Sequence, residues 1–362
     1  MSIALLGSTG SIGVNTLNIA REFGIEVELL VAGRNVSLLK RQIEEFKPAL
    51  VAVADKESAE SLGYPGVLWG EDGILEALER CKSDTVVNAL VGFLGLKPTL
   101  KALELNKRVA LANKESLVVA GKFVDISKIV PIDSEHFALW YILRSKGRPV
   151  KMTITASGGA FRDRPLHELK NVSVSEALDH PNWKMGKKIT VDSATMMNKI
   201  FELLEARWLF GCENLEAVIE TKSIVHAIVE FVDGSSLLHA AYTDMRLPIA
   251  YAVAEDVDRR VVPPIDFSSL GTLEFKKIDP LRYPVWEIKD TVLARPQLGV
   301  VANAANEVAV EAFLKEEIGF LKISETVIDM LRIYENIEID SIEEVFEVDA
   351  MTREYAKSLL GK

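Results

Sequence analysis

The sequence contains few cysteines, and none of its apolar runs is long enough to cross a membrane. Cys81 and Cys212 are the only cysteines in 362 residues, which excludes a disulfide framework and a cysteine-rich metal site. No window approaches the roughly 18 uninterrupted apolar residues of a membrane span, and the N-terminus lacks the charged region and cleavage site of a signal peptide. We therefore expect a protein of a reducing compartment, the cytoplasm, with no membrane partner.

Positive charge is also in deficit. Lysine and arginine number 42 against 53 aspartates and glutamates, for a formal charge of −11, which would repel a phosphate backbone and argues against a nucleic-acid partner. The composition, 48% hydrophobic and 26% charged, is that of a globular chain. At about 150 residues per domain, the length predicts two to three domains.

Short β-branched runs alternate with helical patterns over the first 133 residues. The predicted strands cover residues 3–6, 27–32, 50–54, 67–69, 85–90, 109–112 and 129–132. The spacing of apolar residues predicts helices over residues 14–23, 36–46, 74–81, 97–105 and 114–119. Alternation of this kind is typical of right-handed βαβ units and a parallel sheet. The sequence therefore predicts an α/β protein that opens with a Rossmann-type domain over residues 1–148.

The pattern changes after residue 148. A predicted strand over residues 151–156 is followed by a turn-rich connection, residues 157–187, whose length is typical of a functional lid or of a disordered segment. Apolar spacing predicts one helix over residues 192–210. An Asp-Gly turn predicts a hairpin between strands over residues 225–232 and 235–242.

These elements define the remaining domains. We predict a central α/β (α+β) catalytic domain over residues 149–262, with a mobile lid at 157–187. Residues 263–284 show little periodicity and are predicted to be a linker. Helical spacing over residues 285–362 predicts a C-terminal helical bundle.

A glycine-rich loop, residues 7–13, links the first predicted strand to the first helix. Its glycines are spaced GxxGxxG, which permits a tight turn and a close approach of a pyrophosphate to the N–H groups of the helix N-terminus. A plain glycine turn is the alternative. The next strand ends in Gly33-Arg34-Asn35, where an NAD site would place a carboxylate. A guanidinium there can bind a ribose 2′-phosphate, so we predict NADPH, the alternative for Arg34 being a solvated turn cation.

A second polar motif, Asp133-Ser134-Glu135-His136, follows the last predicted strand of the first domain. Open α/β sheets bind ligands at the carboxyl ends of their strands, and carboxylates without cysteine favour Mg²⁺ or Mn²⁺ over zinc. The alternative is a helix N-cap, which Asp or Ser at this position would also make.

A third motif surrounds the predicted start of the helix at residue 192. Ser193, Asn198 and Lys199 can offer hydrogen bonds and one positive charge to an anion such as a substrate phosphate. Glu202 follows within one turn and, taken alone, is typical of an exposed helix acid. These residues predict a phosphate site.

Together the motifs resemble those of the 1-deoxy-D-xylulose 5-phosphate reductoisomerase family. The resemblance is carried by residues 7–13, 113–116, 133–136, 157–159, 180–186, 191–199, 244–246 and 302–307. It implies an NADPH- and metal-dependent homodimer that converts 1-deoxy-D-xylulose 5-phosphate to 2-C-methyl-D-erythritol 4-phosphate in non-mevalonate isoprenoid synthesis. Ala160 and Thr243 stand where many members have proline. These differences affect the stiffness expected of the lid hinge and one wall of the pocket, but not the expected reaction class.

The resemblance also implies roles for individual residues. The metal, Mg²⁺, Mn²⁺ or Co²⁺, would be bound by Asp133, Glu135 and Glu202, with Lys114 and Glu115 beside the reacting carbon skeleton. Substrate contacts would come from Ser134, Ser157, His180, Trp183, Ser193, Asn198, Lys199 and His226. NADPH contacts would come from Gly7, Thr9, Gly10, Ser11, Ile12, Gly33, Arg34, Asn35, Asn113 and Gly186.

Two other functions compete with this one. A different two-domain reductase, such as a phosphorylating semialdehyde dehydrogenase, would need a reactive cysteine, and neither Cys81 nor Cys212 has a conspicuous base nearby in sequence. A non-catalytic NADPH sensor would bind the cofactor without metal-dependent turnover and would need neither the carboxylates nor the phosphate site.

Overall fold

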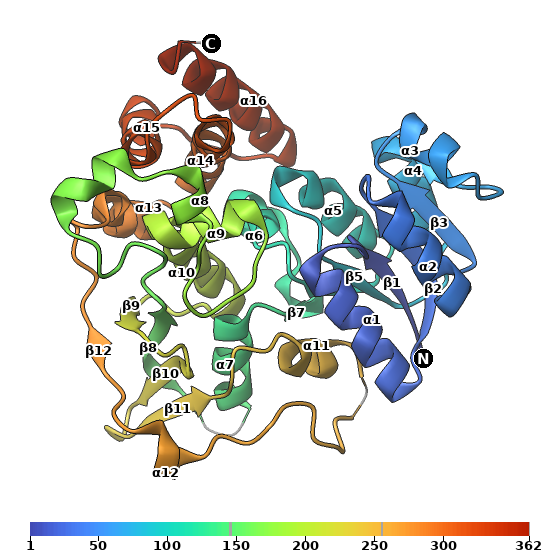
Figure 1. Cartoon of the computed structure of the whole chain (residues 1–362), viewed down its shortest axis with the longest axis horizontal. Helices are drawn as coiled ribbons and strands as arrows, with labels where there is room; N and C mark the ends of the chain where they lie inside the picture. Colours follow the sequence, from blue (N-terminus) through green and yellow to red (C-terminus); the bar gives the residue numbers. More distant parts are fainter. Residues whose placement is uncertain (145–146, 255, 362) are drawn as a thin grey trace. The chain divides into compact units, whose positions relative to one another are not determined.

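The computed structural model describes residues 1–144, 147–254 and 256–361 (Figure 1). The chain divides into two compact units. Unit 1 comprises Met1–Ser116, Val124–Phe137 and Asp244–Pro263, and unit 2 comprises Leu117–Phe123, Ala138–Thr243 and Pro264–Lys362. Each unit is therefore assembled from stretches that are distant in the sequence. The domain boundaries at residues 148, 262 and 284 stay a prediction.

Unit 1 contains a seven-stranded, fully parallel sheet in the order β4-β3-β2-β1-β5-β6-β7. Its strands are β1 (Ser2–Leu6), β2 (Glu26–Ala32), β3 (Leu50–Val53), β4 (Leu68–Trp69), β5 (Thr85–Asn88), β6 (Arg108–Leu111) and β7 (Ile129–Pro131). All seven predicted strands are confirmed to within two residues at each end. The strand order reverses at β1 and β5, which places the ligand-binding edge at the loops after these strands.

The helices of unit 1 connect successive strands, except α11 (Arg246–Val253), which comes from a later stretch of the chain. They are α1 (Ser11–Phe23), α2 (Val36–Phe46), α3 (Lys56–Leu62), α4 (Gly70–Arg80), the 3-10 turn η1 (Gly92–Gly95), α5 (Leu96–Glu104) and α11 (Arg246–Val253). The sequence did not predict α3, because this seven-residue helix has only two apolar positions besides its caps, Asp55 and Gly63. Two helices, α6 (Glu115–Ala120) and α7 (Ser134–Leu143), begin in unit 1 and end in unit 2.

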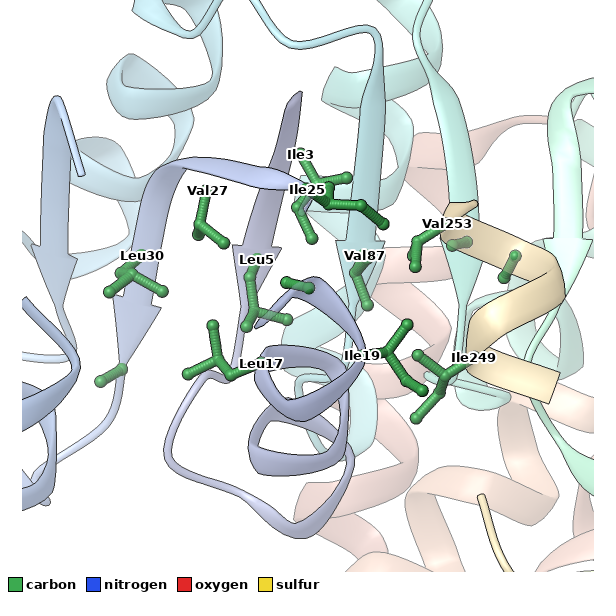
Figure 2. Packing of buried hydrophobic residues seen from close by; sticks show 14 of the residues in the cluster. Ile3, Leu5, Leu17, Ile19, Ile25, Val27, Leu30, Val87, Ile249 and Val253 are labelled. Carbon is green, nitrogen blue, oxygen red and sulfur yellow. The ribbon is translucent and has the colours of Figure 1, made fainter. Parts of the chain in front are cut away.

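The core of unit 1 explains why residues 244–263 belong to it. Ile249, Ala250 and Val253 of α11 are buried in the same hydrophobic cluster as Leu17 and Ile19 of α1. Figure 2 shows Ile19 beside Ile249, with Leu17 directed at Leu5 of the central strand. This helix therefore covers the sheet of the first unit, although the sequence analysis assigned it to the central domain.

Unit 2 contains a five-stranded mixed sheet in the order β11-β10-β8-β9-β12. Its strands are β8 (Pro149–Ala156), β9 (Leu215–Glu220), β10 (Val225–Phe231), β11 (Ser236–Ala240) and β12 (Phe275–Lys276). The predicted hairpin is confirmed: β10 and β11 are antiparallel, and Gly234 has a φ of +81° in the turn. The stretch predicted to be a linker contains β12, which pairs with β9, and the short helix α12 (Phe267–Leu270).

The prediction of a single helix over residues 192–210 is wrong. The structure has α9 (Lys187–Thr195) and α10 (Met197–Phe210), separated at Met196, whose φ is +73°. Met196 is itself buried. Apolar periodicity continues across the break because it reports which residues face the core and is insensitive to one residue in a left-handed conformation.

The remaining elements of unit 2 are helical. They are α8 (Val174–Ala177), α13 (Lys289–Ala294), α14 (Gly299–Leu314), α15 (Phe320–Ile333), α16 (Ile342–Leu359) and the 3-10 turns η2 (Gly121–Phe123), η4 (Leu166–Asn171), η5 (Pro284–Ile288) and η6 (Pro296–Leu298); η3 (Ile126–Lys128) lies in unit 1. Helix α14 packs against both α15 and α16, so the predicted C-terminal bundle is confirmed. Among the described residues, no helix has the length and apolar character needed to cross a membrane.

Candidate active site

The glycine-rich loop joins β1 to α1 in unit 1. Gly7 has a φ of +87°, and a Cβ on it would lie 2.5 Å from the carbonyl oxygen of Ala89. A Cβ on Gly13 would lie 2.2 Å from the carbonyl oxygen of Gly7. Only glycine fits at either position, because β1, β5 and α1 approach one another closely there.

The N-terminus of α1 is open to an anion. Gly10 occupies the N-cap position without a side-chain cap, and the first turn has no acidic residue. Within the described part of the chain, the N–H groups of Ser11, Ile12 and Gly13 have no backbone acceptor. Aligned, unsatisfied N–H groups of this kind are what a pyrophosphate requires.

Arg34 lies at the carboxyl end of β2 with its side chain 85% exposed. Its Nε donates a 2.8 Å hydrogen bond to Oδ2 of Asp55, which also caps α3. The hydrogen bond from Arg34 is the main reason that the pKa of Asp55 is lowered to about 2. Sequence reasoning did not find this carboxylate, because Asp55 comes from the next strand. Asn35 caps α2, accepting a hydrogen bond from the Leu38 N–H at 3.2 Å.

Asn113 is buried and holds the loop that follows β5. Its Nδ2 donates to the carbonyl oxygens of Leu90 and Gly92 at 3.0 and 2.9 Å, and its Oδ1 accepts from the Ser116 N–H at 3.2 Å. A Cβ on Gly95 would lie 2.3 Å from the Asn113 amide. The amide of Asn113 therefore holds the loop after β5 in place by hydrogen bonds to its backbone.

Lys114 and Asp133 form a buried ion pair at the carboxyl ends of β6 and β7. Lys114 Nζ lies 2.8 Å from Asp133 Oδ2, and their side chains are 7% and 12% exposed. Asp133 Oδ1 accepts a hydrogen bond from the Glu135 N–H at 3.2 Å, so the aspartate also caps the start of α7. The capping alternative is therefore confirmed and leaves the second carboxylate oxygen with the lysine. Ser134 Oγ donates to Glu135 Oε2.

In unit 2, His180 bridges two serines. Its Nε2 lies 2.8 Å from Ser157 Oγ and 3.1 Å from Ser193 Oγ. Its Nδ1 accepts from the N–H groups of Asn182 and Trp183 at 3.2 and 3.0 Å. Because Nδ1 accepts, the neutral ring carries its proton on Nε2. Burial, with Arg162 and Lys199 nearby, lowers the pKa of His180 to about 4, so the ring is a neutral donor at pH 7.

A second cluster of hydrogen-bonded polar side chains lies at the start of α10. Lys199 Nζ donates a 2.7 Å hydrogen bond to the Thr155 carbonyl oxygen and forms an ion pair with Glu202. Asn198 Nδ2 donates to the other carboxylate oxygen of Glu202. Glu202 is 1% exposed, so it is not the exposed helix acid that its position alone suggests. A buried carboxylate held this way has a structural or ligand-binding reason to be there.

Trp183 and His226 face each other in unit 2. Their ring centroids are 6.3 Å apart in an edge-to-face arrangement, and His226 Nε2 lies 3.1 Å from the Ala241 carbonyl oxygen. His239 on β11, which the sequence analysis did not single out, contacts His226 with ring centroids 6.1 Å apart. Gly186 is the N-cap of α9 and is exposed.

The segment predicted to be a lid, residues 157–187, has two parts. Its first part is packed into the unit, because Phe161, Leu169, Val172 and Ala177 share a buried cluster with α14 and α15. A double glycine begins it: Cβ atoms on Gly158 and Gly159 would meet Arg162 at 2.8 Å and Ala194 at 2.6 Å. The second part, residues 179–186, contributes no residue to this cluster.

Two anchors that sequence reasoning missed hold both parts of the segment to one turn. Arg162 Nη1 donates to the carbonyl oxygens of Ser157 and Thr221 at 2.9 and 2.8 Å. Asn182 Nδ2 donates to the Thr221 carbonyl oxygen at 2.8 Å and to Ser223 Oγ at 2.7 Å. No local sequence signal reveals the bonds to Thr221 and Ser223, since these partners lie about 40 to 60 residues away in the chain.

The fold and these side chains place the chain in a class, the dinucleotide-dependent oxidoreductases with a Rossmann-type domain. Comparison with known families is more specific. The model of the 1-deoxy-D-xylulose 5-phosphate reductoisomerase family matches residues 3–121, and models of C-terminal domains of the same enzyme match residues 129–210 and 241–355. The chain belongs to the 1-deoxy-D-xylulose 5-phosphate reductoisomerase family.

Full-length relatives agree. The chain is 54% identical to the 1-deoxy-D-xylulose 5-phosphate reductoisomerase of Nautilia profundicola, over 98% of this chain and 99% of the relative. It is 48% identical to that of Helicobacter pylori strain 26695, over 99% and 100%. Among solved structures, a DOX-P reductoisomerase in complex with NADPH, fosmidomycin and magnesium matches with a TM-score of 0.92 and 35% identity, over 100% of this chain and 98% of the other. The Zymomonas mobilis enzyme in complex with NADPH matches with a TM-score of 0.89 and 35% identity, over 99% and 98%.

Proposed function

We propose that this chain catalyses the NADPH- and divalent-metal-dependent conversion of 1-deoxy-D-xylulose 5-phosphate to 2-C-methyl-D-erythritol 4-phosphate, a step of isoprenoid synthesis. The observation that carries the proposal is the match to reductoisomerases over nearly the whole chain, at up to 54% identity among the relatives compared. When bound, the metal supplies Lewis acidity toward the substrate's oxygens and NADPH supplies hydride. The protein supplies binding, orientation and exclusion of water.

The loop after β1 fits a dinucleotide. Side chains at Gly7 and Gly13 would collide with the backbone at Ala89 and Gly7, so glycine is required for the tight turn, and the open N–H groups of α1 suit a pyrophosphate. We assign NADPH contacts to this loop, with Thr9, Gly10, Ser11 and Ile12, and to the end of β2, where Gly33 precedes the exposed Arg34 and the cap residue Asn35. Asn113 shapes the adjacent loop after β5, and Gly186 is the remaining expected contact.

The three carboxylates fit a hard cation. Asp133, Glu135 and Glu202 each offer one carboxylate oxygen, and an all-oxygen donor set suits Mg²⁺, Mn²⁺ or Co²⁺ better than zinc. The magnesium bound in solved relatives supports the first of these ions. Lys114 is paired with Asp133, and with Glu115 we place it beside the reacting carbons. Ser134, next to these ligands, is assigned to the substrate's oxygens.

The groups on β8, α9 and α10 fit the substrate phosphate. Ser157, Ser193 and Asn198 offer neutral donors, Lys199 offers a positive charge, and His180 offers its Nε2–H. His226 lies at the same end of unit 2, facing Trp183. Binding energy from a phosphate remote from the reacting carbons can close a loop over them. We assign that closure to residues 179–186 alone, because Phe161, Leu169, Val172 and Ala177 anchor residues 161–178 in the core.

The chain also has features that suit a homodimer in the cytoplasm. Strand β11 is the edge of its sheet and exposes Leu237 and Leu238. A second copy of the chain at this edge would pair with its backbone N–H and C=O groups and cover the two leucines. The two cysteines are free thiols, as expected of a reducing compartment. Burial raises the pKa of the Cys81 thiol, which speaks against a dehydrogenase that depends on a reactive cysteine.

The test is the complete reaction. Protein, NADPH, Mg²⁺ and 1-deoxy-D-xylulose 5-phosphate are mixed, and absorbance at 340 nm is followed. We expect NADPH oxidation that requires both the sugar phosphate and the metal. NADPH binding without any turnover would instead identify a sensor.

A further inference from the structure

A buried glutamine on α2 holds the second residue of the glycine-rich loop. Gln42 Nε2 donates a 2.8 Å hydrogen bond to the carbonyl oxygen of Ser8. Gln42 is 5% exposed and Ser8 is fully buried, although Gln42 is one of only two glutamines in the chain. A neutral amide buried beneath a phosphate loop is costly to place unless its hydrogen bond matters there.

The other backbone groups of the loop are already fixed. The N–H groups of Gly7 and Ser8 both donate to the Val31 carbonyl oxygen at 2.8 Å, and the Gly10 N–H donates to the Gly7 carbonyl oxygen at 3.0 Å. These bonds tie the loop to β2 and close its turn. They do not fix the direction of the Ser8 carbonyl, which is left to Gln42.

The loop that carries this carbonyl leads directly into the open N-terminus of α1. Gly10, the N-cap of α1, has an extended backbone with ψ of 174°, and the first bond of the helix runs from the Val14 N–H to the Gly10 carbonyl oxygen. The described residues provide no backbone acceptor for the N–H groups of Ser11, Ile12 and Gly13. Where these open N–H groups lie therefore depends on the loop, which Gln42 anchors at the Ser8 carbonyl.

We propose that Gln42 is a positioning residue for the cofactor: it fixes the Ser8 carbonyl and with it the loop of residues 7–13, which presents the open N–H groups of α1 to the pyrophosphate. This inference rests on the proposed binding of NADPH at the loop. An amide suits the task because it donates without adding charge. A carboxylate of the same shape would place a second hydrogen-bond acceptor opposite the Ser8 carbonyl oxygen. A thioether of similar size would offer no hydrogen-bond donor.

The same helix carries the cap residue Asn35 beside Arg34, but the two ends of α2 act on different parts of the cofactor. Arg34 is assigned to the 2′-phosphate, which NADH lacks. Gln42 acts through the pyrophosphate, which NADPH and NADH share. Replacement of Gln42 must therefore lower the binding affinity for NADPH and for NADH by the same factor.

The experiment compares Gln42→Met and Gln42→Glu with the parent enzyme and with the control Gln297→Met, whose glutamine lies in unit 2. Dissociation constants for NADPH and NADH are measured by fluorescence titration, together with KM and kcat. We expect both Gln42 variants to raise the dissociation constants of NADPH and NADH alike by about tenfold, which is the effect of losing one well-placed hydrogen bond. The kcat at saturating NADPH and the KM for the sugar phosphate stay at the parent values. Gln297→Met changes none of these quantities.

Three outcomes would overturn the inference. The first is parent-like NADPH affinity in a folded Gln42 variant. The second is a loss confined to NADPH, which would place Gln42 at the 2′-phosphate. The third is equal loss of kcat and of affinity with a lowered melting temperature, the mark of a purely structural role. If Gln42→Met does not fold, Gln42→Glu, which conserves size, gives the same comparison. Failure of the parent enzyme to bind NADPH would instead refute the proposed function.

Discussion

Lys114 Nζ and Asp133 Oδ2 lie 2.8 Å apart, and this pair joins the carboxyl ends of two neighbouring parallel strands inside unit 1. The exposed pair Lys122–Asp340 of unit 2 has the same separation, but its side chains are 51% and 81% exposed. Equal geometry in different surroundings allows the effect of burial to be measured directly.

The first prediction concerns these two pairs. Lys114→Met leaves a buried carboxylate without its cation and should lower the free energy of unfolding by about 3 kcal/mol, whereas Lys122→Met should change it by less than about 1 kcal/mol. Urea unfolding of both variants measures the difference. Lys114→Met should also reduce kcat more than tenfold, with NADPH affinity kept within about threefold. Equal stability of the two variants would contradict the structural reading of the pair.

Arg34 should determine the choice of cofactor. Arg34→Gln removes the guanidinium at the end of β2 and should raise the KM for NADPH at least tenfold while that for NADH changes little. Asp55→Asn should have the opposite effect on NADPH, because it releases Arg34 from its ion pair. Steady-state kinetics with both cofactors provide the measurement, and the exposed pair member Arg21, changed to Gln, is the control. Equal responses of NADPH and NADH to Arg34→Gln would show that this residue does not contact the 2′-phosphate.

His180 should make the protein less stable in acid. Its pKa is lowered to about 4 in the folded chain, against about 6.5 when unfolded, so between these values the unfolded chain binds more protons. Its contribution to stability is therefore full above pH 6.5 and is lost progressively as the pH falls toward 4. Melting temperatures across this range should fall less steeply for His180→Gln than for the parent. The half-buried His239, with a pKa also near 4, adds a similar slope that both proteins share.

Residues 179–186 should move, and residues 161–178 should not. Limited proteolysis of the free enzyme should cut within the first range, and addition of NADPH, Mg²⁺ and fosmidomycin should slow that cut. Trp183→Ala should lower turnover more than tenfold, about 1.4 kcal/mol, with little change in NADPH affinity. Cleavage first within residues 161–178 would mean that the packing of Phe161 and Leu169 does not hold the segment in solution.

The sequence predicted the architecture well for a physical reason. Strand and helix periodicity record which residues face a core, and in a parallel sheet the two signals alternate regularly. Periodicity could not reveal Met196, since one left-handed residue between two buried helices leaves the apolar pattern intact. It also missed the assignment of Ile249 to unit 1, because burial in the sequence does not say which core a helix joins.

The candidate site was predictable only where the signal is local. The glycine spacing and the position of Asp133 after a strand are local patterns. The partners of those groups are not: Asp55 beside Arg34, Asn182 on the Thr221 carbonyl and Gln42 on the Ser8 carbonyl join residues about 20 to 40 positions apart in the chain. Such contacts are set by the packing of elements, which no short window of sequence contains.

The most direct test of the proposed reaction is the identity of its product. The enzyme is incubated with 1-deoxy-D-xylulose 5-phosphate, NADPH and Mg²⁺, and the product's methyl group is observed by proton NMR. Rearrangement followed by reduction places the methyl group on a carbon that bears no hydrogen, so we expect a singlet. Reduction of the ketone without rearrangement would leave the methyl group beside a hydrogen-bearing carbon. A doublet, or no NADPH-dependent product, would contradict the proposed reaction.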